Sequence, residues 1–182
     1  YTGSDTVIEI PESYKNYKVT VIGASVFNDS KITEVTIPSS IKQIEYYAFS
    51  SCHSLKKVNL SEGLEILNNS VFFNCSELRE IKLPSTLKEI GPRAFSGAAL
   101  NNVVLPDSGK LTKIDEYAFY QSRELTDITI PACITSIPDN VFAECSKEVT
   151  IHGASGSYAQ NYAKKNNLKF KADLNSSSTK AT

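Results

Sequence analysis

The stretch LREIKLPSTLKEIGPRAFSG, residues 78–97, decides the fold because the chain repeats it. Residues 32–52, ITEVTIPSSIKQIEYYAFSSC, show the same order of apolar residues, a proline and an Ala-Phe pair. The phenylalanine recurs at steps of 22, 23, 23, 24 and 23 residues. Self-similarity at a fixed period of about 20–50 residues is typical of repeat proteins. The repeat phenylalanines are Phe27, Phe49, Phe72, Phe95, Phe119 and Phe142.

Each unit contains two segments with the pattern of short strands. Ile81 and Leu83 alternate with polar residues before Pro84, and this period of two predicts a half-buried strand that proline ends. A second extended segment is predicted around the aliphatic residue five positions before each phenylalanine, and the Ala-Phe stretch is expected to form one turn of 3₁₀- or α-helix. A unit of about 23 residues cannot bury its apolar face alone, so the sequence predicts a solenoid of stacked units with parallel strands.

Composition narrows the function classes. The chain has 182 residues, of which 41% are hydrophobic, and its 19 basic and 20 acidic residues give a net charge of −1. This balance argues against general nucleic-acid binding and against wholesale disorder. No apolar run approaches the roughly 18 residues of a membrane span. Because the sequence has no methionine and no signal peptide, we expect a piece of a longer precursor whose targeting signal lies elsewhere.

The quoted stretches at residues 32–52 and 78–97 resemble the BspA-type leucine-rich repeat, and the resemblance extends over roughly residues 6–170. It implies an α/β fold, a curved leucine-rich-repeat solenoid with a parallel β-sheet on the concave side. Short turns, helical pieces and short strands would form the convex side. It also implies a bacterial protein that is secreted or attached to the cell surface, since members of the family have this location and some serve in adhesion.

The two ends depart from the repeat and are expected to cap it. Tyr14 and Tyr17 belong to an irregular first copy and are predicted to cover the open edge of the core. Ser157 is a candidate N-cap of a short helix, on which Tyr158 and Tyr162 form an apolar stripe that closes the other end. We therefore expect one solenoid over residues 1–170, divided into a capping repeat (1–30), interior repeats (31–148) and a helical cap (149–170), followed by a flexible tail or linker (171–182).

The cysteines fit the repeat better than they fit a chemical site. Cys52, Cys75 and Cys145 each follow a repeat phenylalanine by three residues, a position predicted to be small and inward-facing. Cys133 lies elsewhere in its unit. The sequence has no C-x-x-C pair, which argues against a zinc-ribbon metal site and against a thioredoxin-type redox site. Whether Cys52 and Cys75 form a bridge stays open at this stage.

Residues with catalytic chemistry are few and scattered. The two histidines, His53 and His152, lie several units apart, and no nucleophile, phosphate-loop or metal-ligand motif appears. We therefore expect a protein that is not an enzyme and that has no cofactor, no catalytic residue and no metal site.

The polar residues of the predicted strands form the candidate binding site. Stacking should align them in columns on the concave face, with a basic centre at Lys56, Lys57, Arg79 and Lys82. The alternation of Glu34, Lys57 and Glu80 also fits simple stabilisation of the sheet. The same columns predict that Glu148 lies beside Asp127 and that Thr150 lies beside Thr129. The candidate residues are Glu34, Thr36, Lys56, Lys57, Asn59, Arg79, Glu80, Lys82, Asn102, Asp127 and Thr129.

The function expected from these features is binding of a protein partner, such as a host or cell-surface protein, through the concave face, for instance in adhesion. Nucleic-acid binding and membrane insertion are not expected, and the sequence leaves the ligand and the oligomeric state open. One alternative is a structural spacer that displays a neighbouring domain and has no ligand. Another is a carbohydrate-binding module that uses convex aromatic residues, namely Tyr46, Tyr47, Phe73, Tyr117 and Tyr120.

Overall fold

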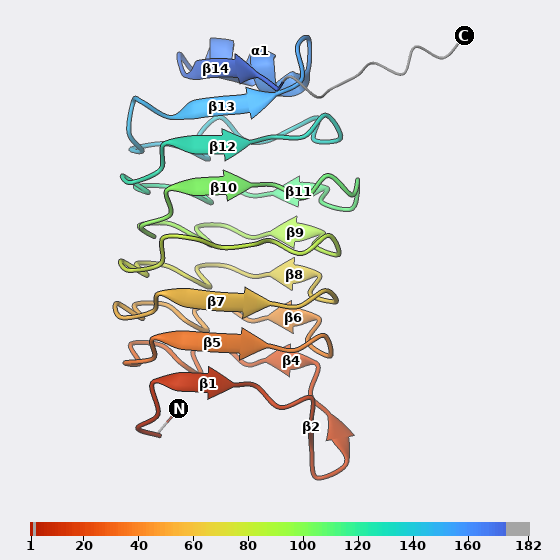
Figure 1. Cartoon of the computed structure of the whole chain (residues 1–182), viewed down its shortest axis with the longest axis vertical. Helices are drawn as coiled ribbons and strands as arrows, with labels where there is room; N and C mark the ends of the chain where they lie inside the picture. The colour runs from red at the N-terminus through yellow and green to blue at the C-terminus, as the bar shows by residue number, and fades with distance from the viewer. Residues whose placement is uncertain (2, 174–182) are drawn as a thin grey trace, which may run out of the picture.

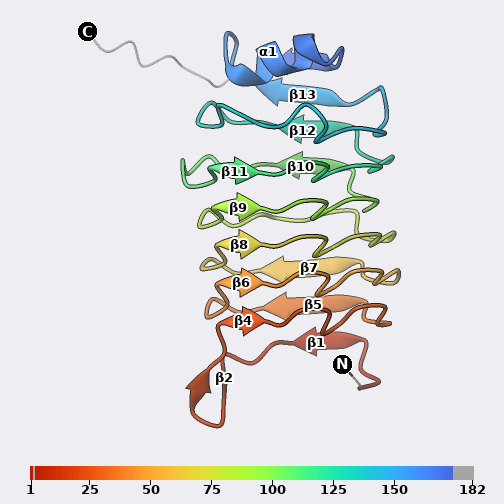
Figure 2. The same cartoon turned by 180° about the vertical axis from the view of Figure 1, so that it is seen from behind.

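The computed structural model describes residue 1 and residues 3–173. These residues form a single stack of similar coils along the long axis of the molecule (Figure 1). Each coil contributes an extended segment to the face that is turned toward the viewer in Figure 1 and a shorter one to the opposite face (Figure 2). The predicted leucine-rich-repeat solenoid with parallel sheets is therefore confirmed.

The longer strands form two separate parallel sheets on one side, and we call their solvent-facing surface the front face. It corresponds to the surface expected to be concave. The first sheet has the order β1-β5-β7 and the second has the order β10-β12-β13-β14. The strands are β1 (Val7–Glu9), β5 (Glu34–Ile37), β7 (Lys57–Leu60), β10 (Asn102–Val104), β12 (Asp127–Thr129), β13 (Thr150–Gly153) and β14 (Lys169–Ala172).

The second extended segments of the first five units form a continuous back sheet, and the segment around Ile137 does not join it. Its order is β11-β9-β8-β6-β4, and each pair is parallel with two residues in register. The inner residue of every strand is the aliphatic residue five positions before a repeat phenylalanine, as predicted. The strands are β4 (Val21–Ile22), β6 (Gln43–Ile44), β8 (Ile66–Leu67), β9 (Glu89–Ile90) and β11 (Lys113–Ile114).

The Ala-Phe stretch forms tight turns where one turn of helix was expected. Tyr47 and Ser51, on either side of Phe49, have φ values of 58° and 57°, and this left-handed backbone cannot continue a right-handed helix. The Phe49 amide instead donates to the carbonyl of Val71 in the next coil at 3.0 Å, and Phe72 repeats the bond to Ala94 at 2.8 Å. The turns are thus a third column of hydrogen bonds between coils.

The repeat phenylalanines form a stacked column through the core. Neighbouring rings have centroids 5.0–5.6 Å apart and planes within 5–21° of each other. Tyr1 covers the Phe27 end of the column at 5.3 Å, and Tyr162 meets Phe142 edge-on at 6.0 Å. Because each ring buries a large apolar area against the next coil, this column couples all the units.

The N-terminal prediction was wrong about two tyrosines. Residues of the irregular first copy form an antiparallel hairpin of β2 (Ser13–Tyr14) and β3 (Tyr17–Lys18), which projects from the stack in Figure 1. Tyr14 and Tyr17 are 64% and 80% exposed and do not cover the core edge. The positive φ values of the two residues between them, 46° and 66°, suit a tight hairpin turn, which carries both rings away from the stack.

At the other end, helix α1 (Tyr158–Lys165) lies over the last coil. The hydroxyl of Tyr158 donates to the carbonyl of Ile137 at 3.0 Å, and the hydroxyl of Tyr162 donates to that of Pro138 at 3.2 Å. Ser157 has the extended backbone of an N-cap, but its side chain makes no capping hydrogen bond. The two tyrosine hydroxyls thus donate hydrogen bonds to backbone carbonyls at the open end of the stack, where no further coil supplies donors.

The chain stays ordered slightly beyond the boundary expected for the tail. Strand β14 pairs with β13 through Ala172, so residues 171 and 172 belong to the sheet and not to a linker. The Asp173 amide still donates to the Gly153 carbonyl at 2.9 Å, and the rest of the expected tail, residues 174–182, lies outside the described residues.

We expect Phe95→Ala to lower the free energy of unfolding by about 3–5 kcal/mol, because Phe95 is fully buried between two stacked rings. The matched variant Phe95→Leu keeps most of the apolar volume and should cost roughly 1 kcal/mol. Chemical denaturation followed by circular dichroism measures both values. An alanine variant as stable as the leucine variant would contradict the role assigned to the column.

Candidate functional site

The lower half of the front face holds a connected polar cluster from β5 and β7. Lys57 Nζ lies 2.7 Å from Glu34 Oε1, and Asn59 Nδ2 donates to the same oxygen at 3.0 Å and to Thr36 Oγ1 at 3.2 Å. The hydrogen bonds from Lys57 and Asn59 lower the pKa of Glu34 below its usual 4.5. These four candidate residues therefore satisfy one another, which fits the stabilising role weighed for the charge alternation.

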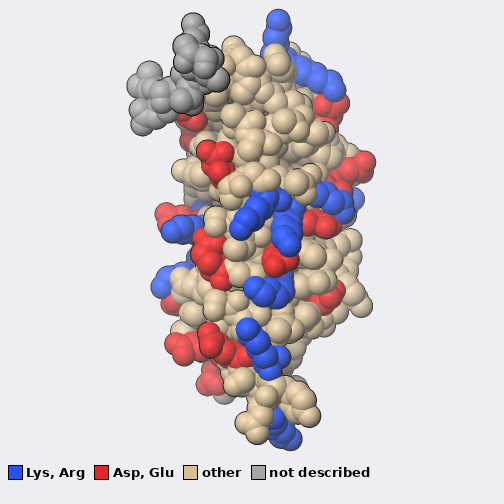
Figure 3. Space-filling view, turned by 90° about the vertical axis from the view of Figure 1, so that its right-hand side faces the viewer, with Lys and Arg blue, Asp and Glu red and all other residues tan. Residues whose placement is uncertain are grey.

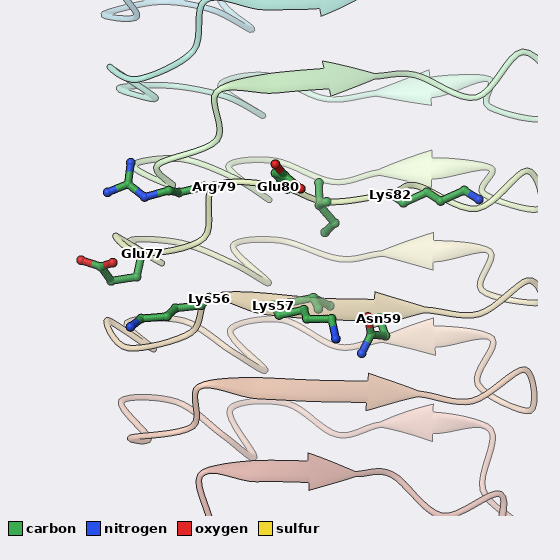
Figure 4. Close-up of a pocket in the computed structure, with 9 residues that line it drawn as sticks. Lys56, Lys57, Asn59, Glu77, Arg79, Glu80 and Lys82 are labelled. Atoms are coloured by element: carbon green, nitrogen blue, oxygen red, sulfur yellow. The ribbon is translucent and has the colours of Figure 1, made fainter.

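The basic centre lies just above this cluster. Lys56, Arg79 and Lys82 are exposed, and none of the three takes part in an ion pair within residues 1 and 3–173. They line a pocket of about 550 Å³ together with Lys57 and Glu80. In Figure 4, Arg79 and Lys56 extend toward one end of the pocket and Lys82 toward the other. This is the part of the candidate site whose charges remain available to a partner.

The upper half of the face brings together a group that the sequence prediction missed. Asp127 pairs in register with Thr150, and Thr129 pairs with His152, so the columns that joined Asp127 to Glu148 and Thr129 to Thr150 were wrong. The last unit has one residue between Val149 and Ile151, whereas the unit before it has two residues between the equivalent Leu125 and Ile128, and this deletion shifts the register by one position. The misplaced Glu148 instead forms an ion pair with Lys169.

The corrected register places His152 between two carboxylates. Its Nε2 lies 2.7 Å from Asp127 Oδ1, and its Nδ1 lies 3.8 Å from Asp173 Oδ1. The hydrogen bond with His152 is the main cause that lowers the pKa of Asp127 below its usual 3.8, with a smaller effect from Thr126. Asn102 lies beside Asp127 in β10 and is exposed. The cluster ties β12, β13 and the end of the described chain together.

Positive and negative side chains are mixed on the side of the solenoid that carries the loops after the front strands. Figure 3 shows Lys and Arg side chains interleaved with Asp and Glu side chains along this side, with no broad field of one sign. On the back sheet, Lys88 pairs with Glu65 at 2.6 Å and Lys113 pairs with Glu89 at 2.6 Å. These two lysines are neutralised by neighbouring carboxylates, whereas Lys56, Arg79 and Lys82 of the front pocket form no ion pair among residues 1 and 3–173.

The aromatic residues of the turns divide into two groups. Arg93 lies over the rings of Tyr117 and Tyr120 at 5.1 and 5.9 Å, and these rings meet edge to face at 5.5 Å. Cation–π and edge-to-face contacts of this kind use the faces that a sugar would need. Tyr46 and Tyr47 remain exposed, and Phe73 is half-buried.

The cysteine position has a role beyond its small size. Cys52 Sγ donates to the carbonyl of Phe27 at 3.0 Å, Cys75 Sγ to that of Phe49 at 3.2 Å, and Cys145 Sγ to that of Phe119 at 2.9 Å. All four cysteines are free thiols. Burial raises the pKa of Cys75 well above 9.0 and that of Cys145 to about 11, so these thiols are protonated donors to the preceding coil.

Clusters of metal-ligand residues and long apolar helices are both absent from residues 1 and 3–173. Within residues 1 and 3–173, no three His, Cys, Asp or Glu side chains converge in a way that could hold a metal ion. In the same part of the chain, no helix has the length and apolar character required to cross a membrane. His53 is exposed in its turn and makes its contacts with Ser76.

The repeat sequence matches a known protein family. The model of the BspA type leucine rich repeat region, which contains six copies, matches residues 5–111 and 67–179. The chain belongs to the BspA-type leucine-rich repeat family. Members of this family are typically bacterial surface or secreted proteins, and their repeats generally serve as protein-interaction modules and not as enzymes. No curated protein matches the chain.

Solved structures of bacterial leucine-rich-repeat proteins resemble this BspA-type repeat chain. The leucine-rich repeat protein of T. pallidum is 25% identical, with a TM-score of 0.80 over 94% of this chain and 87% of that one. One from Bacteroides ovatus is 26% identical, with a TM-score of 0.63 over 82% of this chain and 48% of that one. The pneumococcal vaccine antigen PcpA, at 18% identity, shares the fold with a TM-score of 0.73 over 93% of this chain and 42% of that one.

We expect His152→Leu to raise the pKa of Asp127 toward 3.8, because the variant removes the hydrogen bond that is the main cause of its lowering. Since a lowered carboxyl pKa stabilises the fold above the unfolded pKa, the stability lost in the variant should shrink as pH falls through the folded pKa. Lys171 and Asp173 also face the cluster. NMR titration of the Asp127 carboxyl measures the shift, and equal pKa values in the two proteins would contradict it.

Proposed function

We propose that the chain is a non-catalytic module that binds another protein through its front face, outside a bacterial cell, for instance in adhesion. The observation that carries this proposal is the basic centre, where Lys56, Arg79 and Lys82 are exposed beside a pocket and make no ion pair among the described residues. Stability of the sheet gains nothing from adjacent unpaired cations, so their arrangement favours recognition of an acidic partner.

The rigidity of the surface supports the same function. The strands on either side of residues 79–83 are held by the backbone ladders of β5 with β7 and of β10 with β12, and the phenylalanine column packs in the core of the same coils. Side chains on such a surface lose little conformational freedom when a partner binds, which favours affinity. Val104, which is 55% exposed in the centre of the face, adds apolar area next to the basic residues.

The spacer and the carbohydrate-binding module remain the alternatives. A spacer requires only the stacked core and gives no reason for unpaired cations on one face. A carbohydrate site would depend on Tyr46 and Tyr47, because Tyr117 and Tyr120 are already engaged with Arg93. A spacer predicts that no partner binds, and a carbohydrate site predicts that changes on the front face leave binding unaltered.

Surface plasmon resonance against a panel of host-matrix and bacterial surface proteins tests the proposal. For a partner found in this way, we expect Val104→Arg to weaken binding at least tenfold, because a long charged side chain would obstruct the centre of the front face. The matched control is Val21→Arg, which adds the same side chain to an exposed position of β4 on the back sheet and should leave the affinity unchanged.

Three outcomes would overturn the proposal. The first is the absence of any protein partner from a panel that covers both classes. The second is equal binding by Val104→Arg and the unmodified chain, with both proteins folded by circular dichroism. The third is binding on a glycan array that Tyr46→Ala and Tyr47→Ala abolish while proteins do not bind.

A further inference from the structure

The front sheet is interrupted at one coil. Strands β5 and β7 pair over four residues, and β10 and β12 pair over three. Residues 79–83 lie between these sheets and belong to no ladder in the described chain. Their one backbone bond to a neighbouring front segment is from the Asn101 amide to the Arg79 carbonyl, at 3.1 Å. Figure 4 shows the segment between β7 and the next strand, and we call the space between it and β7 the slot.

Exposure of the core marks the same place. The front-face core residues of intact coils, such as Val35 and Val103, are 0% exposed, whereas Val58, Ile81 and Leu83 are 6%, 9% and 7% exposed. Pockets of about 550 and 650 Å³ lie on the two sides of the segment. Solvent therefore reaches apolar side chains through the interruption.

One local feature distinguishes the coil at which the sheet does not close. The repeat aligns Arg79 with Lys56, and like charges on neighbouring strands repel. Lys57 is engaged with Glu34 on its other side and does not neutralise Glu80.

The slot therefore presents backbone amides and backbone carbonyls that have no backbone partner. In the coil below, the Lys57 amide donates to the Thr33 carbonyl at 3.2 Å. By the same register, the amides of Glu80 and Lys82 face β7, and the carbonyls of Lys56 and Leu60 face the segment. None of these groups has a backbone partner across the slot in the described chain. Such groups are strong donors and acceptors that a ligand can satisfy in place of water.

The side chains around the slot give it a positive rim over an apolar floor. Four cations and two carboxylates line its pocket, so positive charge is in excess. Val58 and Ile81 form the floor. Glu77 lies at the same end as Lys56 and Arg79 in Figure 4, and no ion pair joins it to either among residues 1 and 3–173. This combination suits a carboxylate on a short apolar stem.

We propose that the slot receives an Asp or Glu side chain from an extended acidic segment of the partner protein. Lys56 and Arg79 bind the carboxylate, the amide of Glu80 donates to it, and its methylene groups contact Ile81 and Val58. The partner's own backbone amides donate to the free carbonyls of β7. A phosphate or sulfate group would leave those carbonyls unpaired, and this favours a peptide. The proposal rests on the protein-binding function proposed above and names its partner chemistry.

Fluorescence anisotropy with labelled eight-residue peptides tests the slot directly. We expect an alternating Glu-Val peptide to bind and an isosteric Gln-Val peptide to bind at least tenfold more weakly, because the carboxylate supplies the attraction. Affinity for the Glu-Val peptide should fall at least tenfold in Lys56→Glu/Arg79→Glu. The matched control Lys31→Glu/Lys147→Glu reverses two exposed cations outside the pocket and should change the affinity less than twofold.

Equal binding of the two peptides, or equal loss in the slot variant and its matched control, would overturn the slot. Preference for polygalacturonate over the Glu-Val peptide would also overturn it, since the carboxylate would then come from a glycan. A protein partner that is lost with Val104→Arg but unaffected by Lys56→Glu/Arg79→Glu refutes the slot and leaves the proposed function intact. Absence of any protein partner refutes the proposed function itself.

Discussion

Backbone hydrogen bonding between coils is the constraint on which the rest of the structure depends. A unit of about 23 residues has too little apolar surface to fold alone, so each coil must satisfy its backbone and bury its apolar residues against the next. Three columns of bonds do this, at the front strands, the back strands and the Phe49-type turns. The phenylalanine column fills the space that these bonds enclose.

The fold could be predicted from sequence because its information is repeated. The alternating residues before each proline identified the front strands, and the aliphatic residue at a constant distance from each phenylalanine identified the back strands, without any knowledge of the individual turns. Departures from the repeat were harder to predict. The last unit is shifted by the spacing of Val149 and Ile151, which hid the contact between His152 and Asp127. The tight turns rely on left-handed φ values at residues other than glycine, such as Tyr47, which the composition does not reveal.

The candidate site, like the fold, could be predicted from the sequence only in part. Register alone placed Lys57 beside Glu34 and grouped the basic residues. It could not show which charges are already satisfied, because that depends on side-chain conformation across coils. The structure separates the neutralised cluster around Glu34 from the unpaired rim formed by Lys56, Arg79 and Lys82. An interruption of the sheet was equally invisible, since Ile81 and Leu83 fit the strand pattern as well as any copy does.

Amide hydrogen exchange is the most direct test, because the front segments on both sides of residues 79–83 belong to ladders and residues 79–83 do not. The amides of Lys57 and Asp127 donate to the preceding coil and should be strongly protected. The equivalent amide of Glu80, and that of Lys82, should exchange close to the rate of an unstructured peptide. Protection of Glu80 and Lys82 equal to that of Lys57 would show a continuous front sheet and contradict the account.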